Sequence, residues 1–249
     1  MSKAIRASWW VIIAALLLTP MAFSQNPVYL TLNDGGNNGA VGGIYVGPYD
    51  ATLSSGPNQS GTHTQIICDD FEHEVTTGQS WYANVTSFTS ITNSTQGLVW
   101  SGATQSGVGL GGPIGNMVQG YTAMAYLASQ LLGANSTQAG YLAYAIWSIF
   151  DASAVQSWLN THGAGNMWAQ VQSMAQGAMT AVLNNQVKQS DYAGWEILTP
   201  VNQGPGAPQE FFMFVPEGGT AVMYLLLAGF ACFGTMFFKS RRRQASGAV

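Results

Sequence analysis

Residues 64–88 read TQIICDDFEHEVTTGQSWYANVTSF and contain two strand-like runs separated by a turn sequence. Thr64–Cys68 and Ser80–Phe88 are rich in β-branched and aromatic residues, which favour strands. Between them, residues 76–79 read TTGQ, and their glycine and threonines are typical of a turn. The stretch therefore predicts two strands joined by a polar connection.

Further strands and helices are expected on both sides of this stretch. Short apolar or alternating runs predict strands at 28–32, 44–46, 195–198 and 210–214. Apolar residues at helical spacing predict three helices around 124–131, 142–149 and 167–181, the second capped by Asn135 or Ser136. We therefore expect an α+β fold, with a strand-rich N-terminal part, a small helical cluster, C-terminal strands and one C-terminal transmembrane helix.

The first 24 residues have the three parts of a signal peptide. Lys3 and Arg6 are followed by an apolar run from Trp9 to Leu18, and Ala22 and Ser24 are small residues suited to cleavage before Gln25. We expect residues 1–24 to be removed by signal peptidase, leaving a single exported domain at 25–215. The alternative is a permanent anchor, for which ten apolar residues are short.

The last residues suggest a second targeting signal. Residues 221–238 are uncharged and apolar, and as a helix they would extend about 27 Å, enough for a thin bilayer. Four basic residues follow, which predicts a transmembrane helix with its C-terminal end in the cytoplasm. They are Lys239, Arg241, Arg242 and Arg243.

The motif that precedes this apolar run is Val215, Pro216, Glu217, Gly218 and Gly219, with Thr220 after it. Together, motif, apolar run and basic end (216–249) resemble the PEP-CTERM sorting signal, with Gly218 where that family usually has a second proline. The resemblance implies an exosortase-type membrane peptidase as partner. It also implies insertion in the cytoplasmic membrane through the C-terminal helix, followed by a cell-surface or extracellular location. The alternative is an ordinary single-pass anchor.

The charge of the expected mature region excludes some partners. Between residues 25 and 215, Lys188 is the one basic side chain against ten acidic ones, a net charge of −9. Nucleic-acid binding requires basic side chains that contact phosphates, so we expect no nucleic-acid partner. The polarity comes instead from Asn, Gln, Ser, Thr and Gly, which is compatible with extracellular polysaccharide surroundings.

The densest polar cluster follows Cys68. If the strand continued, Asp70, Glu72 and Glu74 would share one face and could hold Ca²⁺, which prefers oxygen ligands. A zinc site through His73 and Cys68 is a further alternative. Because no calcium-loop spacing is present, we expect no metal and no cofactor, and a solvated strand end instead.

Two short motifs resemble the thioester domains of bacterial surface adhesins: Ile67-Cys68-Asp69-Asp70-Phe71 and Ala145-Ile146-Trp147. In that family a cysteine is joined to a glutamine side chain that lies shortly before the Ala-Ile-Trp segment. Here Ala143 occupies the glutamine position, and Gln138 lies five residues too early. The resemblance therefore implies a related fold without the thioester, and Cys68 as an unreacted cysteine.

No catalytic constellation is present in the sequence, and no Gly-x-Ser-x-Gly motif occurs. We expect a structural or adhesive protein of the bacterial surface or matrix. The alternative is a secreted polysaccharide-active enzyme that uses acidic residues, since paired carboxylates need only be close in space. Clustered carboxylates in a concave pocket would favour the enzyme.

Overall fold

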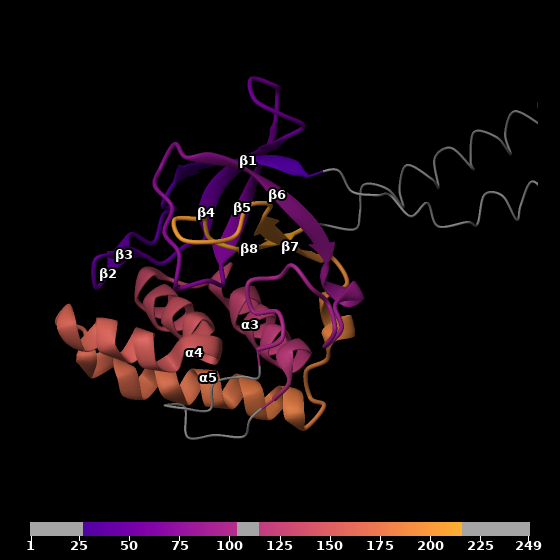
Figure 1. Cartoon of the computed structure of the whole chain (residues 1–249). Helices are drawn as coiled ribbons and strands as arrows, with labels where there is room; N and C mark the ends of the chain where they lie inside the picture. The colour runs from indigo at the N-terminus through magenta and orange to yellow at the C-terminus, as the bar shows by residue number, and fades with distance from the viewer. Residues whose placement is uncertain (1–26, 104–114, 216–249) are drawn as a thin grey trace, which may run out of the picture.

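The structure, a computed structural model, describes residues 27–103 and 115–215. The expected signal peptide (1–24) and sorting tail (216–249) lie outside these residues. Within them the chain forms a β-barrel that packs on three α-helices (Figure 1).

Six antiparallel strands close the barrel in the order β1-β4-β5-β8-β7-β6. Their bounds are β1 Val28–Asp34, β4 Tyr49–Ser54, β5 Thr62–Cys68, β6 Ser80–Ser87, β7 Trp195–Pro200 and β8 Phe211–Phe214. A separate hairpin is made of β2 (Ala40–Val41) and β3 (Ile44–Tyr45). Three 3₁₀ turns lie at Phe88–Ser90, Gly165–Met167 and Gln189–Tyr192.

The barrel strands form because apolar residues recur at every second position. In β1, Leu30 and Leu32 are buried, and in β4 Tyr49 and Ala51 are buried while the residues between them are partly exposed. The strand β1 pairs with both β4 and β6, which closes the sheet and leaves these strands without free edges. The interior is therefore a continuous apolar core.

Three helices cover one side of the barrel, as Figure 1 shows: α3 (Met117–Leu131), α4 (Ser136–Thr161) and α5 (Trp168–Leu183). The α3 helix begins with a reciprocal cap between Asn116 and Gln119, and α4 begins at Asn135, whose side chain accepts from the backbone of Gln138. The middle of α4 is buried almost all round because it lies between the barrel and the other helices.

The predicted fold class is wrong in its arrangement of strands. The individual strands are confirmed within a few residues, at 28–32, 44–46, 64–68, 80–88, 195–198 and 210–214. The three helices are also confirmed, but α3 already begins at Met117 and α4 extends from Ser136 to Thr161, well beyond the expected 142–149. However, the C-terminal strands do not close a separate part of the molecule. Strand β8 pairs with β5 and strand β7 pairs with β6, so both complete the same barrel as the N-terminal strands.

The prediction of a transmembrane helix is also not supported. Among residues 27–103 and 115–215, no helix combines the length and apolar character needed to cross a membrane. The segment 221–238, on which the prediction rested, lies outside the described residues. Insertion in the cytoplasmic membrane through a C-terminal helix is therefore withdrawn as the protein's location.

Candidate functional site

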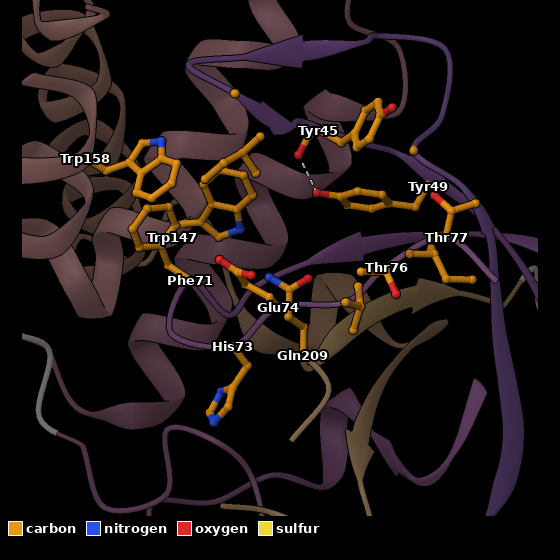
Figure 2. A pocket seen from close by; sticks show the side chains of 15 residues that line it. Tyr45, Tyr49, Phe71, His73, Glu74, Thr76, Thr77, Trp147, Trp158 and Gln209 are labelled. Atoms are coloured by element: carbon orange, nitrogen blue, oxygen red, sulfur yellow. Dashed lines mark hydrogen bonds between the residues drawn. The ribbon is translucent and has the colours of Figure 1, made fainter. Parts of the chain in front are cut away.

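A cavity of about 440 Å³ lies where the β2–β3 hairpin, the end of β1, the connection after β5 and helix α4 meet (Figure 2). Five aromatic side chains contribute to its walls, together with polar side chains from the β5–β6 connection and Gln209. The aromatic residues are Tyr45, Tyr49, Phe71, Trp147 and Trp158; the polar ones are His73, Glu74, Thr76, Thr77 and Gln209.

Helix α4 fixes the hairpin that forms one rim of the cavity. The hydroxyl of Tyr144 donates to the carbonyl oxygen of Val41 at 2.7 Å, and the indole of Trp158 donates to that of Gly42 at 2.9 Å. Burial raises the pKa of Tyr144 to about 12, so its hydroxyl remains a donor at physiological pH. Gly42 has a φ of +57° and a Cβ there would lie 2.9 Å from the Tyr144 oxygen, so the close approach depends on glycine.

One wall consists of packed aromatic rings. Phe71 lies 5.4 Å from Trp147 and 6.2 Å from Trp158 between ring centroids, the latter in an edge-to-face arrangement. The Trp147 indole donates to the carbonyl oxygen of Cys68 at 3.1 Å, which ties α4 to the end of β5. These rings are held by packing and hydrogen bonds before any ligand binds.

The opposite wall is formed by two tyrosines. The hydroxyl of Tyr49 donates to the carbonyl oxygen of Tyr45 at 2.5 Å, and its ring lies edge-to-face on Phe211 at 5.9 Å. Tyr45 is 52% exposed, and its ring covers Gly35, where an added Cβ would come within 2.4 Å of the ring. Tyr45 therefore offers an accessible aromatic surface at the cavity.

Asp70 holds the polar connection that carries Phe71, His73 and Glu74. Its buried carboxylate accepts from the backbone N–H of Glu72 at 3.0 Å and lies 2.7 Å from Nδ1 of His73. The side chain of Gln209 donates to the backbone carbonyl of Asp70 at 2.9 Å. These contacts fix the connection against the barrel.

A group of three buried carboxyls, Asp69, Asp70 and Glu210, lies behind this connection. Glu210 accepts from the hydroxyl of Tyr121 at 2.5 Å, from the backbone N–H of Val99 at 3.1 Å and from the hydroxyl of Thr199. Its pKa is raised mainly by burial, against the effect of these donors.

Asp69 has a different environment. Within the described residues, no N–H or hydroxyl group donates to its carboxyl oxygens, although the side chain is fully buried; its neighbour is the carboxyl of Glu210. Burial, then the charges of Glu210 and Asp70, raise the pKa of Asp69 well above its usual value. Burial and the neighbouring carboxyls therefore disfavour the charged form of Asp69.

The calcium candidates do not converge. Strand β5 ends at Cys68, so Asp70, Glu72 and Glu74 do not share one strand face: Asp70 is buried, Glu72 is exposed, and Glu74 is exposed at the cavity. Among the residues that the structure describes, no group of three or more His, Cys, Asp or Glu side chains is arranged to hold a metal ion.

Cys68 is buried, and its thiol donates to the backbone carbonyl of Asp70 at 3.0 Å. Burial, followed by the charges of Asp70 and Asp69, raises the pKa of the thiol. Ala143 is buried in α4, the helix that contacts Cys68 through Trp147. The same Asp70 carbonyl also accepts a hydrogen bond from the side-chain amide of Gln209. A glutamine therefore does lie near Cys68, but it precedes β8 and is neither at position 143 nor Gln138.

Sequence reasoning identified Glu74 and the neighbourhood of Cys68 but missed the aromatic walls and Gln209. One signal was present: Trp147 and Trp158 are eleven residues apart, about three helical turns, which predicts one helix face. Of the sorting motif, Val215 is described and donates its backbone N–H to Gly194, while Pro216, Glu217, Gly218, Gly219 and the basic residues after them lie outside the described residues.

Comparisons with known proteins add one distant structural neighbour. No protein-family model and no curated protein matches the chain. Among solved structures, the N-terminal thioester domain of the fibronectin-binding protein SfbI from Streptococcus pyogenes is similar, with 11% identity, 78% of this chain and 97% of that chain covered, and a TM-score of 0.39. A similarity this low carries no argument about function. The neighbour is a thioester domain, the family that the two short motifs resemble. The PEP-CTERM resemblance receives no support from these comparisons.

Proposed function

We propose that this domain binds carbohydrate without cleaving it, as an adhesive or matrix component of the bacterial surface. The observation that carries the proposal is the cavity with aromatic walls on two sides and neutral hydrogen-bonding groups between them. Its volume of about 440 Å³ is within the range of small-ligand sites.

The chemistry of the cavity suits a sugar ring. The C–H faces of a pyranose are apolar and pack on aromatic rings, while its hydroxyls need donors and acceptors at the edge. Tyr45, Phe71 and Trp158 supply aromatic surface, whereas Trp147 is 2% exposed and packs on Phe71 from the interior. Thr76, Thr77 and Gln209 supply hydroxyl and amide groups that both donate and accept.

Binding is favoured over hydrolysis by the position of the acidic residues. Glycoside hydrolysis by the common route needs two carboxyl groups on either side of the scissile bond. Among the described residues that line the cavity, Glu74 is the one carboxylate. The clustered carboxyls Asp69, Asp70 and Glu210 are fully buried behind it and are used in internal contacts.

Export and sorting remain part of the proposal. The N-terminal signal and the motif Val215–Gly219 support removal of the first segment by signal peptidase and recognition by an exosortase-type peptidase. A polysaccharide-binding domain delivered to the cell surface would then meet its polymer there.

The test is glycan binding by the full chain, measured with neutral oligosaccharides of glucose, galactose and N-acetylglucosamine. We expect binding to quench tryptophan fluorescence, because Trp147 and Trp158 line the cavity. Tyr45→Ala should weaken affinity by about three- to tenfold, the effect of losing one aromatic contact. Tyr82→Ala is the matched control, since Tyr82 is 44% exposed on β6 and does not line the cavity.

Two results would contradict the proposal. One is the absence of binding to every glycan class, acidic and amino sugars included. The other is binding that Tyr45→Ala and Tyr82→Ala weaken equally, because the contact would then lie elsewhere.

A further inference from the structure

We propose that the cavity prefers amino sugars, and that Glu74 selects them by pairing with the protonated amine. This inference rests on the proposed carbohydrate-binding function and specifies its ligand class.

The first observation is the unused carboxylate of Glu74. Among the described residues, none donates a hydrogen bond to this carboxylate or forms an ion pair with it, whereas Asp70 and Glu210 are both engaged. Figure 2 shows the Glu74 side chain pointing toward Phe71 and Trp147, while His73 points away from them. Glu74 thus brings an available negative charge to the aromatic wall.

The second observation is that aromatic rings lie close to this carboxylate. The faces of Trp and Phe rings attract cations, and the attraction grows when the cation is partly withdrawn from water. Phe71 and Trp158 are the partly exposed rings of an aromatic cluster at the cavity wall, while Trp147 is buried against Phe71. The ring of Trp158 also stacks on that of His162, with 3.7 Å between the ring centroids. An ammonium group placed between this cluster and Glu74 would interact favourably with both.

The third observation is the charge around the cavity. No lysine or arginine is among the described residues that line it, and Lys188, the one basic residue between 25 and 215, lies before the 3₁₀ turn Gln189–Tyr192. The neighbouring Glu72 adds negative charge on the same connection, whereas the buried carboxyl of Asp70 is paired with His73, which also lines the cavity. Cationic sugars are therefore favoured, and uronic acids or sulfated sugars are disfavoured.

The size of the cavity favours a sugar over a small free amine. A volume of about 440 Å³ is larger than a single ammonium group occupies. Thr76, Thr77 and Gln209 also line this cavity. Those groups match the hydroxyls of a pyranose ring. The amine would select the ligand, and the ring would supply most of the contact area.

The experiment compares three tetrasaccharides on the full chain by titration calorimetry at mildly acidic pH: one of glucosamine, one of N-acetylglucosamine and one of glucose. We expect the glucosamine oligomer to bind about three- to tenfold more tightly than the other two, as for a cation at a partly exposed aromatic and carboxylate site. Added salt should reduce this preference.

Glu74→Gln is expected to reduce the preference for the glucosamine oligomer over the glucose oligomer to about twofold or less, because the charge that pairs with the amine is removed. Glu72→Gln is the matched control: Glu72 is exposed on the same connection but does not line the cavity. It should retain the preference. Thermal melting of both variants checks that the fold is intact.

The outcomes separate the two proposals. Equal binding of all three oligomers would overturn the amino-sugar inference and leave carbohydrate binding in place. Loss of the preference in Glu72→Gln as well as in Glu74→Gln would also overturn it, since the effect would then belong to the general charge of the connection. If no oligosaccharide binds, both proposals fail.

Discussion

At the scale of single residues, the environment of Asp69 gives a testable dependence of stability on pH. Its carboxyl is fully buried beside that of Glu210, no N–H or hydroxyl group of the described residues donates to it, and burial raises its pKa. A raised pKa in the folded state means that stability is fully present below the unfolded pKa and decreases as pH rises toward the folded pKa. The free energy of unfolding should therefore fall as pH increases from about 4 toward neutrality.

Asp69→Asn should raise the free energy of unfolding at neutral pH by about 1–3 kcal/mol, because the amide cannot ionise. The decrease with pH should become smaller but should not vanish, since the pKa of Glu210 is also raised by burial. Urea denaturation at several pH values measures both effects.

Glu210→Gln is the informative comparison, and its effect should have the opposite sign. Glu210 accepts from Tyr121, Val99 and Thr199, and an amide cannot accept from all three donors in the same way. We expect it to destabilise the domain by about 1–3 kcal/mol. If Asp69→Asn destabilised the domain as much as Glu210→Gln, the inference that burial disfavours the charged form of Asp69 would be wrong.

Cys68 leads to a second prediction at this scale: the mature protein carries no thioester. Its buried thiol donates to the Asp70 carbonyl, and its raised pKa keeps it protonated. Intact mass should equal the sequence mass and should not respond to methylamine. A deficit of about 17 Da, the mass of ammonia, would contradict this, and its loss in Gln209→Ala but not in Gln138→Ala would identify Gln209 as the acyl donor.

What the sequence could reveal about individual residues depended on where β5 ends. The expectation that Asp70, Glu72 and Glu74 share a face assumed that the strand continues beyond Cys68. Instead the Asp70 carboxylate accepts from the backbone of Glu72, a local turn that competes with strand pairing. Glu74 reaches the cavity for this reason, and periodicity alone could not show it.

At the scale of elements, the β2–β3 hairpin depends on its attachment to α4. The hairpin has two residues in each strand and pairs with no barrel strand among those described. An isolated hairpin is marginal in water, so its position depends on bonds from outside it. Tyr144 and Trp158 of α4 donate to two of its carbonyl groups, and Tyr49 of β4 donates to that of Tyr45.

Trp158→Phe should loosen the hairpin while keeping an aromatic ring at the cavity. The substitution leaves the carbonyl of Gly42 without its donor and should cost about 1 kcal/mol locally. Hydrogen exchange of residues 40–45 should speed up about fivefold. Trp81→Phe is the control, because Trp81 lies on β6 and its indole N–H has no hydrogen-bond partner among the described residues. If hydrogen exchange of the hairpin were similar in both variants, the bond from Trp158 would not hold the hairpin in place.

Elements with a strong local sequence pattern could be predicted from the sequence. The pairing of strands, which depends on segments far apart in the chain, could not. Helices α3, α4 and α5 were found because long apolar faces repeat at helical spacing. No strand was expected at β4, although Tyr49, Ala51 and Leu53 alternate with polar residues there. Closure of the barrel depends on pairing β5 with β8 across the whole helical segment, which no local pattern encodes.

At the scale of the whole molecule, the folded domain reaches the expected sorting motif without a linker. Strand β8 ends at Phe214, and the backbone N–H of Val215 donates to Gly194 at 2.7 Å. Val215 is both the last described residue and the first residue of the motif, so Pro216 and Glu217 directly follow the barrel. A peptidase that recognises the motif must therefore act next to the folded domain. Its access to the motif depends on the few residues that follow Val215.

We predict that the protein in native cells begins at Gln25 and ends near the motif, after removal of both terminal segments. Small residues at Ala22 and Ser24 suit signal peptidase, and Pro216 and Glu217 with the two glycines after them form the expected sorting motif. Intact mass of the protein from native cells measures both ends at once. The double substitution Pro216→Ala/Glu217→Ala should leave the start at Gln25 but retain the C-terminal segment, whereas Gln203→Ala, in the exposed loop before β8, should be processed like the wild type. An identical C-terminal end in the double variant and the wild type would show that the motif is not recognised.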